Sequence, residues 1–191
     1  MKNNPIHDMD VTFSVTRALA QKSAGINQEG LLASERIDEI MMMCDRQQPV
    51  YEQISSFSVA LYTLGFFDCP DLMSFEDVDA HEAAAILREH FTEIRSAALP
   101  ADYRITESGE RYLLVVGDPL LPVHFAALVD ARSDRPFFSK LPFFGSGFDS
   151  LKELTEAFSP TDGVSPDDFH YFKRVWHGRI PPEAVGKIFI V

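Results

Sequence analysis

The segment 103–119, with the sequence YRITESGERYLLVVGDP, marks the place where the hydrophobic pattern of the chain changes from helical spacing to alternation. Residues 103–107 alternate in the manner of a half-buried strand, and 112–116 is an unbroken run of Tyr, Leu and Val. Both patterns are typical of strands, and Ser108-Gly109 between them supplies turn residues. The segment therefore predicts a β-hairpin whose second strand ends at Gly117-Asp118-Pro119.

Further strands are expected between this hairpin and the C-terminus. Val123–Asp130 and Phe137–Ser139 are short runs rich in strand-forming residues, separated by the polar turn 132–136. The last five residues, Lys187–Val191, form another β-type run. This run is expected to join the sheet, because an apolar strand left unpaired favours aggregation. An antiparallel sheet of three to five strands is therefore expected in this half.

Two helices are expected in the same half of the chain. Ser150-Leu151-Lys152-Glu153 is a capping-box sequence that opens a helix through Phe158. Ser165-Pro166-Asp167-Asp168 combines a cap residue, proline at the first helical position and acidic residues in the first turn. The helix that follows is expected to run to about Trp176, with an aromatic stripe made of Phe169, Phe172 and Trp176.

The N-terminal half has the pattern of a bundle of about four helices. Apolar side chains recur at helical spacing in four segments, which cover residues 11–19, 27–47, 50–64 and 84–98. The fourth helix has two candidate capping boxes, Ser74–Asp77 and Asp79–Glu82, and Pro100 closes it.

The predicted fold class is therefore α+β: about four helices, then the antiparallel sheet with two C-terminal helices and a final C-terminal strand. Leu99–Asp102 is too short for a flexible linker. Residues 1–191 are accordingly expected to form a single compact domain, with a helical subregion 1–100 and an α+β subregion 101–191. The composition, 46% hydrophobic and 24% charged residues, is that of an ordinary globular protein.

Charge and hydropathy disfavour several classes of partner. No stretch approaches the ~18 consecutive apolar residues of a membrane span, and Met1–Asp10 lacks the basic start and apolar run of a signal peptide. A cytoplasmic protein is therefore expected. The net charge of −12 disfavours binding to nucleic-acid phosphates and to anionic membranes. The expected partner is another protein or a second copy of this chain.

No catalytic or metal-binding motif is found in the sequence. The six histidines include no H-x-x-x-H pair, and there is no C-x-x-C. The glycine-containing loop 143–150 lacks the Gly-Lys-Ser/Thr ending of a P-loop, and Asp149 places a negative charge where an anion would bind. It is interpreted as a turn before the capped helix. No metal site, cofactor or catalytic residue is predicted.

A concentration of aromatic side chains is the feature that points to a function. Five phenylalanines fall within twelve residues, 137–148, around a segment broken by Pro142 and Gly145. Aromatic residues with cations nearby are typical of protein interfaces. We therefore expect a non-enzymatic interaction protein: an adaptor, assembly factor or regulatory subunit. The expected partner-binding residues are Phe137, Phe138, Phe143, Phe144, Phe148, Lys140 and Trp176, with Lys173 and Arg174 also at the rim.

Three alternatives stay open at the level of sequence. The phenylalanines can belong to the core, covering one face of the sheet and closing its edge. A small-molecule-binding domain or enzyme would use a pocket between the sheet and the C-terminal helices, with His124, Asp118 and His170 as polar contacts. Self-association through the C-terminal strand would give a homodimer and is compatible with either function.

Overall fold

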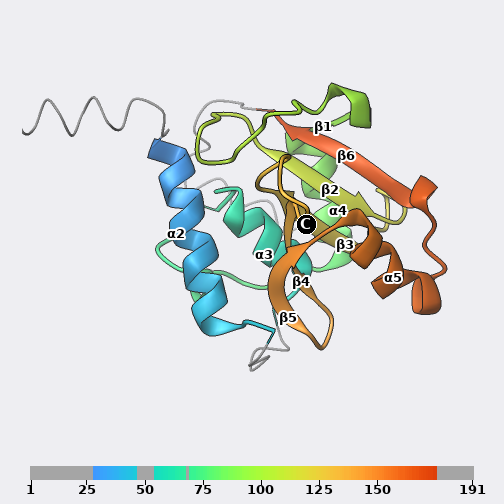
Figure 1. Ribbon diagram of the computed structural model, residues 1–191. Helices are drawn as coiled ribbons and strands as arrows, with labels where there is room; N and C mark the ends of the chain where they lie inside the picture. Colours follow the sequence, from blue (N-terminus) through green and yellow to red (C-terminus); the bar gives the residue numbers. More distant parts are fainter. Residues whose placement is uncertain (1–27, 47–53, 68, 176–191) are drawn as a thin grey trace, which may run out of the picture.

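The computed structural model describes residues 28–46, 54–67 and 69–175 (Figure 1). It contains a six-stranded sheet in the order β1-β6-β2-β3-β4-β5, in which all neighbouring strands are antiparallel. The strands are β1 Phe91–Ile94, β2 Tyr112–Val116, β3 His124–Leu128, β4 Phe137–Leu141, β5 Gly145–Asp149 and β6 Phe169–Arg174. The helix expected at 11–19, Trp176 and the strand expected at Lys187–Val191 lie outside the described residues.

Helices accompany the sheet on both faces, and the α+β class is confirmed. They are α2 Gln28–Met43, α3 Ser56–Thr63, α4 Ala80–His90 and α5 Leu151–Asp162, with the 3-10 turns η1 Leu72–Ser74, η2 Ser96–Ala98 and η3 Pro166–Asp168. The capping boxes predicted for α4 and α5 are present, with Asp79 paired to Glu82 and Ser150 paired to Glu153. The element order differs from the prediction at several points, described below.

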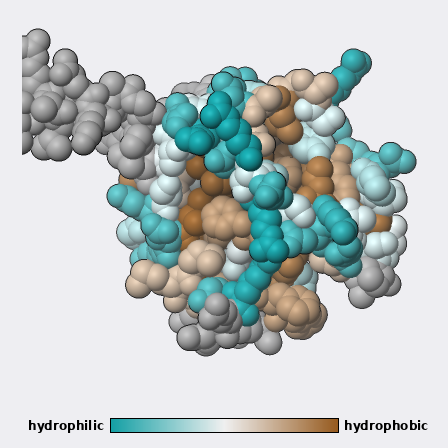
Figure 2. Space-filling view, viewed as in Figure 1, coloured by the Kyte–Doolittle hydropathy of each residue, from teal (hydrophilic) through white to brown (hydrophobic). Residues whose placement is uncertain are grey.

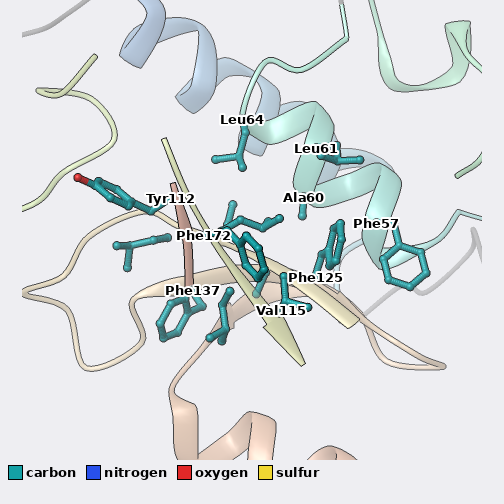
Figure 3. Close-up of a cluster of buried hydrophobic side chains, with 14 of the residues drawn as sticks. Phe57, Ala60, Leu61, Leu64, Tyr112, Val115, Phe125, Phe137 and Phe172 are labelled. Carbon is teal, nitrogen blue, oxygen red and sulfur yellow. The ribbon is translucent and has the colours of Figure 1, made fainter. Parts of the chain in front are cut away.

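The helix α3 lies across one face of the sheet at the centre of the core (Figure 3). Seven of its eight residues are buried, because the sheet covers one side of the helix and α2 packs against another. The Phe57 ring meets the Phe125 ring of β3 edge to face, with 4.9 Å between centroids. Phe172 of β6 and Val115 of β2 belong to the same cluster. The buried hydroxyls of this helix are satisfied within the fold, since Ser58 Oγ donates to Asp77 Oδ1 and Thr63 Oγ1 donates to the Val59 carbonyl.

The helix α5 covers part of the opposite face. Phe125 of β3 points toward α3. Because side chains alternate across a strand, its neighbour His124 points to the opposite face. Phe158 of α5 is buried with its ring centroid 4.7 Å from that of His124. The segment before β2 covers another part of this face, where the rings of Tyr103 and Tyr112 lie 5.0 Å apart. Burial on both faces explains why β2 is apolar throughout.

Two segments that were expected to be helical are strands, so those predictions are wrong. The helix that begins at Ala80 ends at His90, and Phe91–Ile94 is β1 rather than its continuation. The helix expected over 165–176 is limited to the turn η3, after which the chain forms β6. Apolar and aromatic residues at these spacings suit either structure. Pairing of β6 with both β1 and β2 overrides the local helical pattern.

The hairpin expected over 103–116 does not form. The Ile105 N–H donates to the Val129 carbonyl at 2.8 Å, and the Ala131 N–H donates to the Tyr103 carbonyl at 2.9 Å. The segment before β2 therefore runs beside the end of β3, and β2 pairs with β6 instead. Residues 145–149, expected to be a turn, form the strand β5. With β1 and β6, this gives six strands where three to five were expected.

Phe172 provides a test of the placement of β6. Its side chain is 6% exposed, so Phe172→Ala is expected to lower the free energy of unfolding by about 3–5 kcal/mol. Phe144→Ala removes a ring of the same size from a residue that is 64% exposed. This substitution is expected to change the free energy of unfolding by less than about 0.5 kcal/mol. Chemical denaturation of both variants measures the difference. Equal losses in the two variants would contradict the burial of Phe172 between β6 and the core.

Candidate protein-interaction site

Two phenylalanines project from the turn between β4 and β5, and we call residues 142–144 the hairpin tip. Leu141 pairs with Gly145 at its base, and the Phe144 N–H donates to the Leu141 carbonyl at 3.3 Å. Phe143 has φ 64°, the only non-glycine residue with positive φ in the described chain. Proline followed by a left-handed residue is the pattern of a type II turn, in which glycine normally takes Phe143's position. Phe143 is 79% exposed.

The aromatic segment divides into a buried part and an exposed part. Phe137 and Phe138 are core residues, 3% and 0% exposed, and Phe148 is half-buried with its ring 5.1 Å from that of Phe138. Of these five phenylalanines, only Phe143 and Phe144 are exposed. In the space-filling view, apolar atoms protrude at the lower edge, where Figure 1 places the β4–β5 turn, and more gather between α2 and β5 (Figure 2).

The cationic rim expected around these rings is not formed. Lys140 is only 7% exposed. Lys173 is paired with Glu110 on the Tyr112 side of β6. Arg174 donates to the carbonyls of Leu64 and Gly65, both at 3.0 Å. These cations are therefore engaged within the fold or buried, and the exposed tip is purely apolar.

The base of the hairpin is held by an ion pair between a buried carboxylate and a partly exposed arginine. Asp149 is fully buried, and its two carboxylate oxygens accept from Arg46 Nη2 at 2.5 and 2.6 Å. Ser139 Oγ donates to the same carboxylate at 3.1 Å. A side chain at Gly147 would come within 2.8 Å of Arg46 Nε. The close approach of Arg46 to β5 therefore depends on the missing side chain of Gly147. The sequence-based interpretation of 143–150 as a turn missed this role.

The segment that carries Arg46 also docks on β5 through its backbone. The Ser146 N–H donates to the Cys44 carbonyl at 2.8 Å, and Asp45 forms a parallel bridge with Ser146. At Gly145, which has φ 74°, a Cβ would lie 2.4 Å from the Asp45 carbonyl oxygen. These contacts continue the sheet beyond β5 and fix the hairpin relative to α2. A charged residue inside a glycine-rich run was the one signal of this contact in the sequence.

The three polar residues of the small-molecule alternative are not gathered into one site. His124 is opposite Val116 in the β2–β3 register, and His170 is opposite Val115 in the β2–β6 register, so the two imidazoles point to opposite faces. His170 Nδ1 lies 2.9 Å from Glu93 Oε1. Asp118 is exposed and accepts from the Leu120 N–H in the turn after β2.

His124 is fully buried between the sheet and α5. Burial, together with the positive charges of Lys140 and Arg46, lowers the pKa of its imidazole to about 3. The side chain is therefore neutral at pH 7. Neither ring nitrogen has a hydrogen-bond partner among the described residues, which leaves two buried polar atoms unsatisfied there.

Comparison of the chain with models of protein families, with curated proteins and with solved structures found no match. None of the described helices has the length and hydrophobicity of a membrane span. Within the same part of the chain, no group of three or more His, Cys, Asp or Glu residues is arranged to hold a metal ion.

The depressed pKa of His124 predicts a specific loss of stability in acid. The folded state, with a pKa of about 3, binds no proton at His124 where the unfolded state, with the ordinary value of 6.5, does. This contribution to stability is complete above pH 6.5 and falls as the pH falls toward 3, by about 1.4 kcal/mol per pH unit. Between pH 6 and 4.5, the wild type is expected to lose about 2 kcal/mol more than His124→Leu. Urea denaturation at both pH values measures this, and parallel losses would contradict a neutral buried His124.

The Arg46–Asp149 pair can be tested by a double-mutant cycle. Arg46→Met leaves a buried carboxylate without its cation and is expected to lower the free energy of unfolding by about 3 kcal/mol, at the lower end for a buried pair because Arg46 is partly exposed. Asp149→Asn in the Arg46→Met background is expected to restore at least half of this loss. Denaturation of the four proteins gives the coupling energy. Simple additivity of the two losses would show that the pair does not hold the hairpin.

Proposed function

We propose that this chain is a non-enzymatic interaction protein, an adaptor, assembly factor or regulatory subunit, that inserts Phe143 and Phe144 into an apolar pocket on a protein partner. The observation that carries the proposal is the left-handed backbone of Phe143, an exposed aromatic residue at a turn position that favours glycine. Two adjacent rings at the end of a hairpin form a compact apolar anchor.

The conformation of Phe143 has a cost that its own contacts do not offset. A left-handed conformation costs a residue with a side chain roughly 1–2 kcal/mol relative to the right-handed region. Its side chain is 79% exposed, so little of its apolar area is removed from water within the chain. Strained residues persist only where the surrounding structure holds them, and they concentrate at ligand and partner sites. Burial of the ring in a partner would supply the stabilisation that the fold does not.

The contacts at the base of the hairpin favour binding of a partner without a large rearrangement of the hairpin. The base is held by the Arg46–Asp149 ion pair and by the Ser146–Cys44 backbone hydrogen bond. A preorganised anchor loses less conformational entropy on association than a flexible one. The rings are therefore offered to the partner in a defined position, as in interfaces where a few aromatic residues contribute most of the binding energy.

A tip variant with an intact fold tests the proposal. In the double variant Phe143→Gly/Phe144→Ser, glycine relieves the left-handed backbone, so the stability is expected to be unchanged or higher. Binding to the partner is expected to weaken by about 30-fold, as for the loss of an interface hot spot of about 2 kcal/mol. Affinity purification with quantitative mass spectrometry identifies proteins that the wild type retains and the variant loses, and light scattering reports whether the partner is a second copy.

The matched control is Leu120→Ser/Leu121→Ser, which removes another exposed apolar pair, 72% and 55% exposed, from the turn between β2 and β3. A partner that binds the hairpin tip is retained by this control and lost by the tip variant. The proposal fails if both variants retain the same proteins at the same level, or if both lose them equally through general loss of surface hydrophobicity.

A further inference from the structure

One edge of the sheet is covered and the other is open. At the β5 edge, the segment that carries Arg46 bonds to Ser146 through its backbone. At the opposite edge, β1 pairs with β6 alone among the described strands, and Figure 1 shows β6 between β1 and β2. An uncovered edge strand presents N–H and C=O groups that can pair with another strand. The sheet can therefore be extended at β1.

The hydrogen bonds between β1 and β6 decide which backbone groups face the open side. The Val175 N–H donates to the His90 carbonyl at 2.8 Å. Because hydrogen-bonded pairs alternate with non-bonded pairs along an antiparallel ladder, Thr92 and Ile94 also bond to β6. Glu93, between them, directs its N–H and C=O away from β6. Neither of these groups has a hydrogen-bond partner among the described residues.

The extended backbone continues for one residue beyond β1. Arg95 has φ −74° and ψ 148°, so its N–H and C=O also face the open side, and its side chain lies on the same face as that of Glu93. The Arg95 carbonyl accepts from the Ala98 N–H at 2.8 Å and keeps a second lone pair for another donor. The Arg95 side chain is exposed. The open edge thus presents an acidic and a basic residue two positions apart on one face.

This edge is complementary to a second copy of itself. When two copies pair antiparallel about a twofold axis at Ile94, Glu93 of each copy lies opposite Arg95 of the other. Each such pair can exchange two backbone hydrogen bonds, and it places a carboxylate beside a guanidinium. The carboxylate of Glu93 is 57% exposed, and His170 contacts its Oε1, which leaves Oε2 for the guanidinium. On the other face, half-buried Ile94 meets Ile94 of the second copy.

Other twofold registers match less well. An axis at Glu93 would place two carboxylates opposite each other, which is destabilising. An axis at Thr92 would pair Phe91 with Glu93 of the second copy, but the Phe91 N–H already donates to the Leu87 carbonyl. With the axis at Ile94, both the charges and the free backbone groups are matched.

We propose that two copies of this chain associate through β1, antiparallel about Ile94, so that their sheets join into one continuous sheet. The interface is short, because the chain turns into η2 directly after Arg95, and a weak, concentration-dependent dimer is expected. The hairpin tip lies between β4 and β5, at the other edge of the sheet. Self-association through β1 is therefore independent of the partner proposed for the tip.

Sedimentation velocity of the full chain over a wide range of protein concentrations tests for the dimer. The mass is expected to rise from 21.5 kDa toward twice that value as the concentration increases. Salt at about 0.15 M limits the repulsion between two chains of net charge −12, because it screens charges over about 8 Å. A wild type that stays monomeric at every concentration overturns the proposal, including the case in which another segment of the same chain covers the edge.

Two charge-reversed variants test the register. Arg95→Glu brings like charges together with Glu93 of the second copy, and Glu93→Arg does the same with Arg95. Each variant alone is expected to raise the dissociation constant of the dimer by about tenfold or more. An equimolar mixture of the two is expected to associate again, because each variant supplies the charge that the other lacks. The inference is overturned if the mixture associates no better than the single variants, or if both variants dimerise as the wild type does.

Two further variants separate the edge from general effects of charge and from the tip. Arg132→Glu makes the same change in net charge at an exposed residue in the turn between β3 and β4, and is expected to dimerise as the wild type does. Phe143→Gly/Phe144→Ser is also expected to dimerise normally, and loss of the dimer in this variant would assign self-association to the tip and overturn the inference. Thermal melting of all variants verifies that they are folded.

Discussion

The burial of the Asp149 carboxylate is the constraint on which the arrangement around the hairpin depends. A carboxylate removed from water needs a cation, and Arg46 reaches it because Gly147 has no side chain in the way. The same approach brings residues 44–46 alongside β5 and so fixes α2 relative to the sheet. Since α2 also packs on α3, one buried charge connects the hairpin to the centre of the core.

Elements that depend on short-range chemistry could be predicted from the sequence, and those that depend on distant pairing could not. The capping boxes at Asp79 and Ser150 involve residues three positions apart. The spacing in 169–174 fits a helix or a strand, and only the neighbours β1 and β2 decide between them. At the candidate site, the sequence shows that five phenylalanines gather in 137–148, but which of their rings are exposed depends on the register of β4. Arg46 and Asp149, 103 positions apart, share no local pattern.

The position of β6 has a consequence for the synthesis of the protein. This strand follows every other described strand in the sequence, yet in the sheet it lies between β1 and β2 and is the neighbour that links them. On the ribosome, β1 has no partner strand until residues 169–174 have emerged, and β2 exposes the edge that β6 will cover. Such unpaired edges are where nascent chains aggregate or mispair. The time needed to translate the stretch from Ile94 to Phe169 is thus a period of vulnerability, which a late central strand makes unavoidable.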